Sequence, residues 1–239
     1  MAVIFEQYNE GGQRTISLTA SQHILIGKFS GSTVNRLNNN LMQQSSVLTF
    51  DVNYFPTFVG VVCGQSTVIE KQYINNKWRV TVHVNRGLLV PVTIYCFADV
   101  KDVAPAPSTS GYGLELYNEA GAVIYSSKFS HMIIRHVSTI FSSQTSVTTP
   151  SLSNVAYVSS SYVANHAFES TYTPEGYWTQ QRVTGYKYNG TTITGELVTL
   201  ERSQQFSRPI VLNYNNMVNL MLIDIANINA RHPSTYIMP

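Results

Sequence analysis

The chain has 239 residues, of which only 12% are Asp, Glu, Lys or Arg, and its formal net charge is +2. Average soluble proteins carry a charged share of roughly 25%, so neutral polar groups must cover most of this surface. Such a surface has little long-range repulsion and suits a component that lies against permanent neighbours. The composition therefore favours an assembly subunit over a freely diffusing enzyme.

The charge pattern argues against nucleic acid and membrane partners. Lys and Arg are scattered singly, whereas the neutralisation of several phosphates requires a basic cluster. The most apolar stretch, residues 88–100, is shorter than the ~20 residues of a membrane span and contains Pro91 and Asp99. Residues 1–6 have neither a basic region nor a cleavage-site pattern. We therefore expect a first strand there, synthesis in a cytoplasm and no membrane insertion.

Alternation of apolar and polar residues predicts β-strands along most of the chain. The clearest case is 77–84, where Trp78 and three valines share one face. No long stretch keeps a helical period, and the Asn-rich segment 33–44 is predicted to be a loop. The predicted strands are 2–8, 13–18, 22–29, 47–53, 58–63, 66–74, 77–84, 92–100, 113–117, 123–126, 132–137, 155–163, 177–188, 191–202 and 218–225.

Two hairpins follow from their turn residues. The Asn-Asn dipeptide at 75–76 tolerates positive φ, and the resulting register places Tyr73 opposite Trp78, a favourable cross-strand aromatic pair. The Asn-Gly dipeptide at 189–190 is the strongest short-range hairpin signal and joins the strands that flank it.

The chain divides at 104–111, where Pro, Ala, Ser and Gly indicate a linker. The segments on either side begin alike: 6–12 reads Glu-Gln-Tyr-Asn-Glu-Gly-Gly and 115–121 reads Glu-Leu-Tyr-Asn-Glu-Ala-Gly. The identities share one spacing of 109 positions, that between Tyr8 and Tyr117, which favours an internal duplication. We therefore predict an all-β chain of two related antiparallel β-sandwich domains in tandem, residues 1–103 and a longer 112–239.

The two cysteines, Cys63 and Cys96, both lie in apolar strand-like runs. Cysteine is among the most buried residue types, so we interpret them as two buried free thiols. A disulfide between them stays open at this point.

We find no sequence pattern of a metal centre or of a catalytic site. His131 and His136 are five positions apart, which places them on opposite faces of a strand. A Ser–His–Asp arrangement is built from distant residues and stays open. The chain contains no Gly-x-Ser-x-Gly elbow, no phosphate-binding glycine loop and no His-Glu-x-x-His helix. We expect a protein that is not an enzyme and that holds no metal or cofactor.

Aromatic residues around the second hairpin are the candidate interaction surface. Exposed Tyr and Trp offer large contact area at low entropic cost, to a protein partner or to the face of a sugar. The alternative interpretation is that half of them face the core. The residues are Tyr172, Tyr177, Trp178, Tyr186 and Tyr188.

Residues 112–124 read Tyr-Gly-Leu-Glu-Leu-Tyr-Asn-Glu-Ala-Gly-Ala-Val-Ile. The phrase Tyr-Gly-Leu-x-x-Tyr-Asn-x-x-Gly-x-Val-Ile resembles the opening of small β-rich minor tail proteins of long-tailed bacteriophages, which lie at or near the tail tip and fibres. In those proteins the phrase opens the chain. Here it opens the second half, and a diverged copy at 3–12 opens the first. The resemblance brings no catalytic residues with it.

The resemblance implies a structural protein of the virion, made in the host cytoplasm, that packs on other tail proteins and on copies of itself. Edge strands and polar loops would make these contacts, with a role in host attachment. The alternative is a carbohydrate- or receptor-binding module that uses the aromatics around Tyr177 and Trp178. A hydrolase of cell-envelope material is a third hypothesis, which no sequence feature favours.

Overall fold

The computed structural model describes residues 6–8, 14–17, 22–35, 43–103, 115–117, 123–140, 145–159, 166–173, 176–205 and 218–239. These ranges contain twenty strands, one 3-10 helix, η1 (Val100–Asp102), and one α-helix, α1 (Ala226–Arg231). The all-β prediction is therefore confirmed.

The strands are β1 (Glu6–Tyr8), β2 (Arg14–Ser17), β3 (His23–Ser32), β4 (Val34–Asn35), β5 (Gln43–Gln44), β6 (Ser46–Val52), β7 (Phe58–Cys63), β8 (Val68–Ile74), β9 (Lys77–Val84), β10 (Pro91–Asp99), β11 (Glu115–Tyr117), β12 (Val123–Ser126), β13 (Ile133–Ile140), β14 (Ser146–Thr148), β15 (Val155–Ser159), β16 (His166–Thr173), β17 (Gly176–Tyr188), β18 (Thr192–Gln205), β19 (Val218–Asp224) and β20 (Tyr236–Ile237). Strands β4, β5, β14 and β20, which the sequence did not predict, have only two or three residues, too few to show an alternation. The prediction of a loop at 33–44 is therefore wrong at both of its ends, while residues 36–42 lie outside the described ranges.

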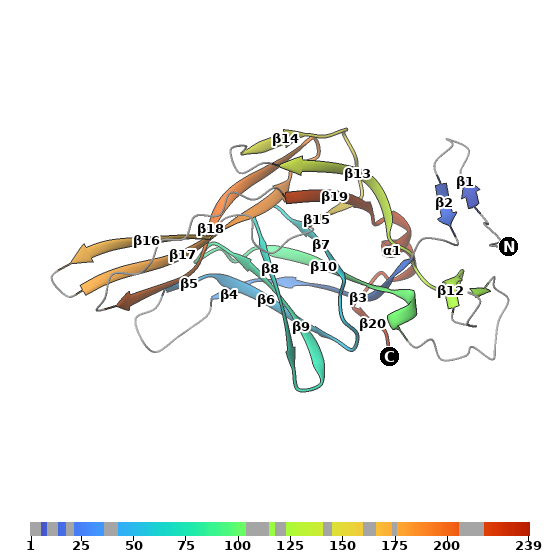
Figure 1. The fold of residues 1–239 in the computed structure, drawn as a ribbon, viewed down its shortest axis with the longest axis horizontal. Helices are drawn as coiled ribbons and strands as arrows, with labels where there is room; N and C mark the ends of the chain where they lie inside the picture. The colour runs from blue at the N-terminus through green and yellow to red at the C-terminus, as the bar shows by residue number, and fades with distance from the viewer. Residues whose placement is uncertain are drawn as a thin grey trace, which may run out of the picture.

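A seven-stranded antiparallel sheet forms the centre of the molecule, in the order β13-β19-β15-β7-β10-β3-β20 (Figure 1). Strands β13, β19 and β15 from the second half of the chain occupy one side and strands β7, β10 and β3 from the first half the other. The halves meet where β15 pairs with β7, through Tyr157 opposite Val61 and Val158 opposite Gly60. The last strand, β20, returns from the end of the chain to pair with β3.

The predicted boundary at 104–111 thus does not separate two sheets. One hydrophobic cluster draws on both sides of it: Val61 and Ile94 belong to the same cluster as Tyr157 and Leu222. Strands of the two halves are instead joined edge to edge in one sheet, where β7 pairs with β15. Most of the linker lies outside the described residues, and the duplication itself stays a prediction.

Two smaller sheets pack on one face of the central sheet. They are β4-β6-β9-β8 and β14-β18-β17-β16, with β5 paired to β18. Valines of β9 and Ile193 of β18 lie in the same buried cluster as the central strands. Full burial of such a side chain stabilises the fold by roughly 1.5–3 kcal/mol.

Helix α1 covers part of the opposite face. Its Ile228 packs with Tyr95 and Phe97 of β10. The Tyr95 hydroxyl donates to the side-chain oxygen of Asn229 at 2.9 Å, and Lys28 Nζ donates to the backbone oxygen of His232 at 2.6 Å. The C-terminal segment is thereby fastened to strands of the first half.

The two copies of the sequence motif form hairpins with the same register. Glu6 pairs with Ser17 in β1–β2, and Glu115 pairs with Ser126 in β11–β12, both members shifted by 109 positions. Each ladder has an irregularity directly before the tyrosine of the motif.

The correspondence continues into the next strand of each half. β3 pairs with β10 and β13 pairs with β19, and each of these ladders skips one residue. The skipped residue is Ile26 in β3 and Arg135 in β13, again 109 positions apart. Bulges re-aim a strand and are designed features rather than defects, so their coincidence is a specific likeness between the halves.

We expect neither segment 1–103 nor segment 112–239 to unfold cooperatively when it is produced alone. Each would expose the unpaired edge of β7 or β15 and part of the shared core. The two segments produced together should associate and recover one cooperative transition, measured by urea denaturation followed by circular dichroism and by size-exclusion chromatography. A cooperative transition in an isolated segment would contradict the single shared core.

Candidate functional site

Tyr186 and Tyr188, two members of the predicted interaction surface, are structural instead. Tyr186 is only 4% exposed, and burial raises its pKa to about 12. Tyr188 is half-buried, and its hydroxyl accepts from the backbone N–H of Leu152 and donates to the backbone oxygen of Gly190. The prediction of an exposed surface is wrong for Tyr186, because the loop and strands around it close over the ring.

The side chains of Tyr172, Tyr177 and Trp178 lie outside the described residues. The backbone register places Tyr172 opposite Tyr177 where β16 turns into β17. These strands and β18 extend away from the central sheet as a long arm (Figure 1).

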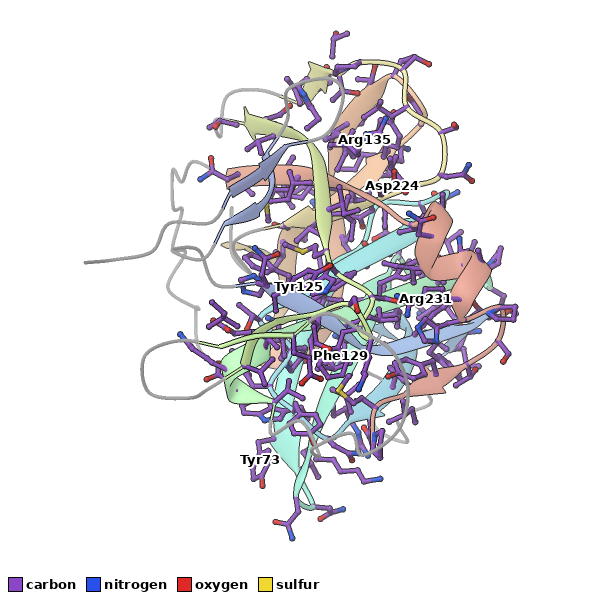
Figure 2. The ribbon with its side chains drawn as sticks, turned by 90° about the vertical axis from the view of Figure 1, so that its right-hand side faces the viewer. Tyr73, Tyr125, Phe129, Arg135, Asp224 and Arg231 are labelled. Carbon is purple, nitrogen blue, oxygen red and sulfur yellow. The ribbon has the colours of Figure 1, made fainter. Side chains whose placement is uncertain are left out.

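A different aromatic cluster is exposed near the turn of the β8–β9 hairpin. Tyr73 is 58% exposed and Phe55 is 47% exposed, and Trp78 contacts both. The ring centroids of Phe55 and Trp78 are 4.8 Å apart at an interplanar angle of 65°, and those of Tyr73 and Trp78 are 5.2 Å apart at 51°. We call these three residues the hairpin patch; Figure 2 shows Tyr73 at the outer end of the hairpin.

The local sequence accounts for this geometry. Asn75 and Asn76 have φ values of 52° and 62°, which a type I′ turn requires at both central residues. The turn sets Tyr73 opposite Trp78, and the predicted aromatic pair is confirmed. Trp78 also pairs with Val52 of β6, so the hairpin patch is the exposed end of a face whose remainder is buried.

Lys71 holds the loop that presents Phe55. Its Nζ donates to the backbone oxygens of Pro56 and Thr57, the latter at 2.9 Å, and lies 5.1 Å from the centroid of the Phe55 ring. Burial lowers the pKa of Lys71 from 10.5 to about 8. Through its two hydrogen bonds the Lys71 ammonium acts as an internal clamp on the loop that carries Phe55.

The opposite face of the hairpin is polar. Arg79 Nε and Nη2 donate to the two oxygens of Asp51 at 2.9 and 3.1 Å, and this hydrogen bonding lowers the pKa of Asp51. Bidentate pairs of this kind hold both partners in one plane. The hairpin thus has one aromatic face and one face of paired charge.

Ser45, His83 and Glu70 form the arrangement closest to a catalytic one. Ser45 Oγ lies 2.8 Å from His83 Nδ1, and His83 Nε2 lies 3.1 Å from a Glu70 oxygen. A nucleophilic serine must reach its substrate, yet Ser45 is 0% exposed and the carboxylate is the member that faces solvent. The chain of contacts therefore ties β8 and β9 to the start of β6.

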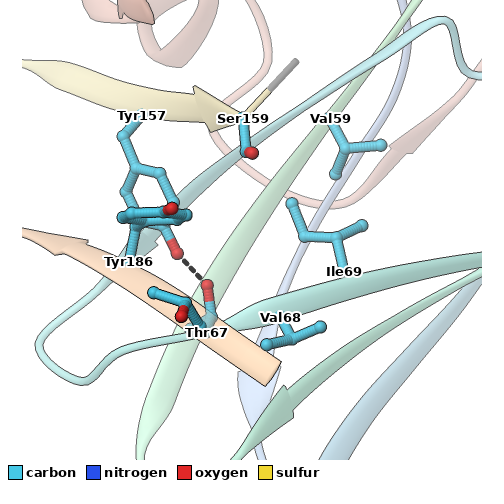
Figure 3. Close-up of a pocket in the computed structure, with 8 residues that line it drawn as sticks. Val59, Thr67, Val68, Ile69, Tyr157, Ser159 and Tyr186 are labelled. Atoms are coloured by element: carbon cyan, nitrogen blue, oxygen red, sulfur yellow. Dashed lines mark hydrogen bonds between the residues drawn. The ribbon is translucent and has the colours of Figure 1, made fainter. Parts of the chain in front are cut away.

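A small recess lies where β7, β8, β15 and β17 meet (Figure 3). Its free volume, about 20 Å³, holds one water molecule. The hydroxyls of Thr67 and Tyr157 are hydrogen-bonded to each other in it (Figure 3). The recess is too small for an organic substrate.

Within the described ranges, no three His, Cys, Asp or Glu side chains gather in a way that could hold a metal ion. His131 Nε2 instead bonds the backbone oxygen of Ser126 at 2.8 Å. Cys63 and Cys96 are both buried and free, as predicted, and burial raises the pKa of Cys96 to about 12.

No helix among the residues that the structure describes is long and apolar enough to cross a membrane. Comparisons with protein-family models, with curated proteins and with solved structures found no match. A functional assignment therefore rests on the residues of this chain.

The sequence indicated the contact between Tyr73 and Trp78 but not its exposure. Phe55 was missed altogether, since it follows a strand in an irregular segment. The signal that identifies the site is the combination of an aromatic pair with a tight turn two residues away, because the turn lies at the periphery of the fold.

We expect Lys71→Met to change how stability depends on pH. A lysine whose pKa is lower in the folded state binds fewer protons there, so the free energy of unfolding gains as pH rises from about 8 towards 10.5. Over this window the free energy of unfolding of the wild type should increase relative to that of Lys71→Met, as measured by urea denaturation at each pH. Tyrosines that titrate there do so in both proteins, so the difference isolates Lys71; a difference that stays constant with pH would contradict the burial of the ammonium.

We expect Gly185→Ala to destabilise the protein by roughly 1–3 kcal/mol through overpacking. A Cβ at Gly185 would stand 2.8 Å from the backbone oxygen of Thr67 and 2.7 Å from Val198 Cγ2. Gly64 is the matched control, since nothing lies within 4 Å of a Cβ added there, and Gly64→Ala should stay within roughly 0.5 kcal/mol of wild type. Urea denaturation measures both; equal stability of the two variants would argue against the close contact of β8 with β17.

Proposed function

We propose that the protein is a structural component of a bacteriophage tail, at the tail tip or associated with the fibres. The proposal rests on the sequence motif at 112–124, which resembles the opening of phage minor tail proteins, and on its diverged copy at 3–12. The function is to pack on other tail proteins and on copies of this chain, without chemistry of its own.

We also infer that the two halves descend from one β unit. The paired registers of β1–β2 and β11–β12 support this, as do the skipped residues Ile26 and Arg135 at the same spacing of 109. A further support is the order of the central sheet, in which strands of the two halves follow one another in mirrored sequence from the β7–β15 contact outwards.

The edge strand β13 supports a role in assembly. Among the described strands it pairs with β19 alone, so its other edge is open to strand addition. It exposes Ile133, Ile134 and Val137, the last at 56%. Its one formal charge, on Arg135, is neutralised by Asp224 at 2.7 Å (Figure 2). Such a strand exposes apolar side chains and an unpaired edge to water, so burial against a neighbouring protein would stabilise it.

The arrangement of potential catalytic groups fits a passive role. The serine of the Ser45–His83 contact is buried, and the recess beside Tyr157 holds no more than one water molecule. Low charge over the whole chain favours lasting contact with neighbours.

Immunogold electron microscopy of phage particles from the source strain tests the proposal. Antibody against this protein should label the tail tip or the base of the fibres, and mass spectrometry of purified particles should detect the chain. Particles of an isogenic phage that lacks the gene are the control. Absence of the chain from particles, when it is expressed in infected cells, would overturn the proposal.

A further inference from the structure

We propose that the hairpin patch, formed by Phe55, Tyr73 and Trp78, is a binding site for a neutral polysaccharide of hexopyranose units. Sugar rings would stack their C–H faces on the exposed rings of Tyr73 and Phe55. This goes beyond the proposed function, because a tail component that only packs on its neighbours has no need of a sugar site.

The rings are held in place before any ligand arrives. Trp78 contacts both exposed rings, and Lys71 fixes the loop that carries Phe55. Side chains that are already ordered lose little conformational entropy on binding, so more of the contact energy appears as affinity. Leaving two aromatic rings about half exposed has no benefit for folding, since their burial would stabilise the fold.

The spacing of the rings favours a chain of sugars over a single small ligand. The two centroid separations, 4.8 and 5.2 Å, place Phe55 and Tyr73 no more than about 10 Å apart across Trp78. Both rings are steeply inclined to the indole, so the three do not form one flat platform. Two separate ring faces match two pyranose units of one polymer.

The charges around the hairpin patch favour a neutral ligand. Arg79 and Asp51 neutralise each other on the far side of the hairpin, and the Lys71 ammonium is turned towards two backbone carbonyls. Exposed amides at the turn, those of Asn75 and Asn76, are available for sugar hydroxyls.

The size of the site argues against a protein as the occupant. A stable protein interface buries about 1,200–2,000 Å² in total, from some 20–30 residues on each side. The hairpin patch has three residues, and the strands that carry it show a charged face on their other side. A few stacked sugars need no larger area.

The test measures binding of immobilised neutral polysaccharides from bacterial surfaces, first on an array and then by titration calorimetry with the soluble polymer. Wild type should bind at least one of them. Tyr73→Ala and Phe55→Ala should each weaken that binding by about tenfold or more, a loss of about 1.4 kcal/mol. Tyr73→Phe, which keeps the ring, should retain it. Leu89→Ala is the control, because Leu89 is 64% exposed and lies outside the hairpin patch.

Three results would overturn the inference: no neutral polysaccharide binds, binding survives in the double variant, or only charged polymers bind. Loss of the Tyr73→Ala variant from phage particles with sugar binding intact would mark the hairpin patch as a protein contact, which also overturns it. Tyr73→Ala and Phe55→Ala each lose a ring contact with Trp78, so a small decrease in urea midpoint is expected while the cooperative transition is retained. The outcome is separable from the tail assignment, because a particle protein without sugar affinity keeps that assignment and loses this site.

Discussion

The central sheet depends on one close antiparallel contact, between Gly60 of β7 and Val158 of β15. A Cβ on Gly60 would stand 2.8 Å from Ile223 Cδ1 and 3.3 Å from Ala156 Cβ, so a residue without a side chain lets the face pack closely there. The same glycine lies opposite Tyr95 on its other side. Because the two halves join here, their cores merge, and both smaller sheets lie over one face. The β8–β9 and β17–β18 hairpins belong to these two smaller sheets, so their positions also follow from this contact.

The two sides of the sheet differ at positions of β3 and β13 that share the spacing of 109 residues. Lys28 and Val137 are 109 positions apart in β3 and β13. Lys28 is buried, because the C-terminal segment returns to pair with it and to accept its hydrogen bond at His232. Val137 pairs with Met221 of β19 on one side, has no described strand on its other side and is exposed to solvent. Among the described residues, the C-terminal segment covers the outer side of β3, and no strand pairs with the outer side of β13.

The pattern of adjacent residues was sufficient to predict strands and hairpins. The alternation at 77–84 and the positive φ that Asn75 and Asn76 tolerate are properties of adjacent residues, and both predictions are confirmed. The β7–β15 contact joins residues nearly a hundred positions apart and depends on shape, so no pattern within either strand specifies it. For the same reason the sequence could not specify that Tyr186 is among the aromatics that face the core: its neighbour Thr67 lies directly before β8, far from it in the chain.

The two long hairpins show why an aromatic ring near a turn is a binding residue in one place and a structural one in another. Tyr188 lies directly before its turn, and the loop after β14 lies against it, with Leu152 and Gly190 bonded to its hydroxyl. Tyr73 lies two residues before its own turn, yet its ring contacts only Trp78 among the described aromatic residues and is largely open to water. Both rings come from antiparallel hairpins, although the turns differ: Asn75 and Asn76 both have positive φ, whereas in the second turn Gly190 does. What separates them is whether another part of the chain reaches the tip, and for Tyr73 none of the described segments does so, which leaves an ordered aromatic surface for a ligand from outside.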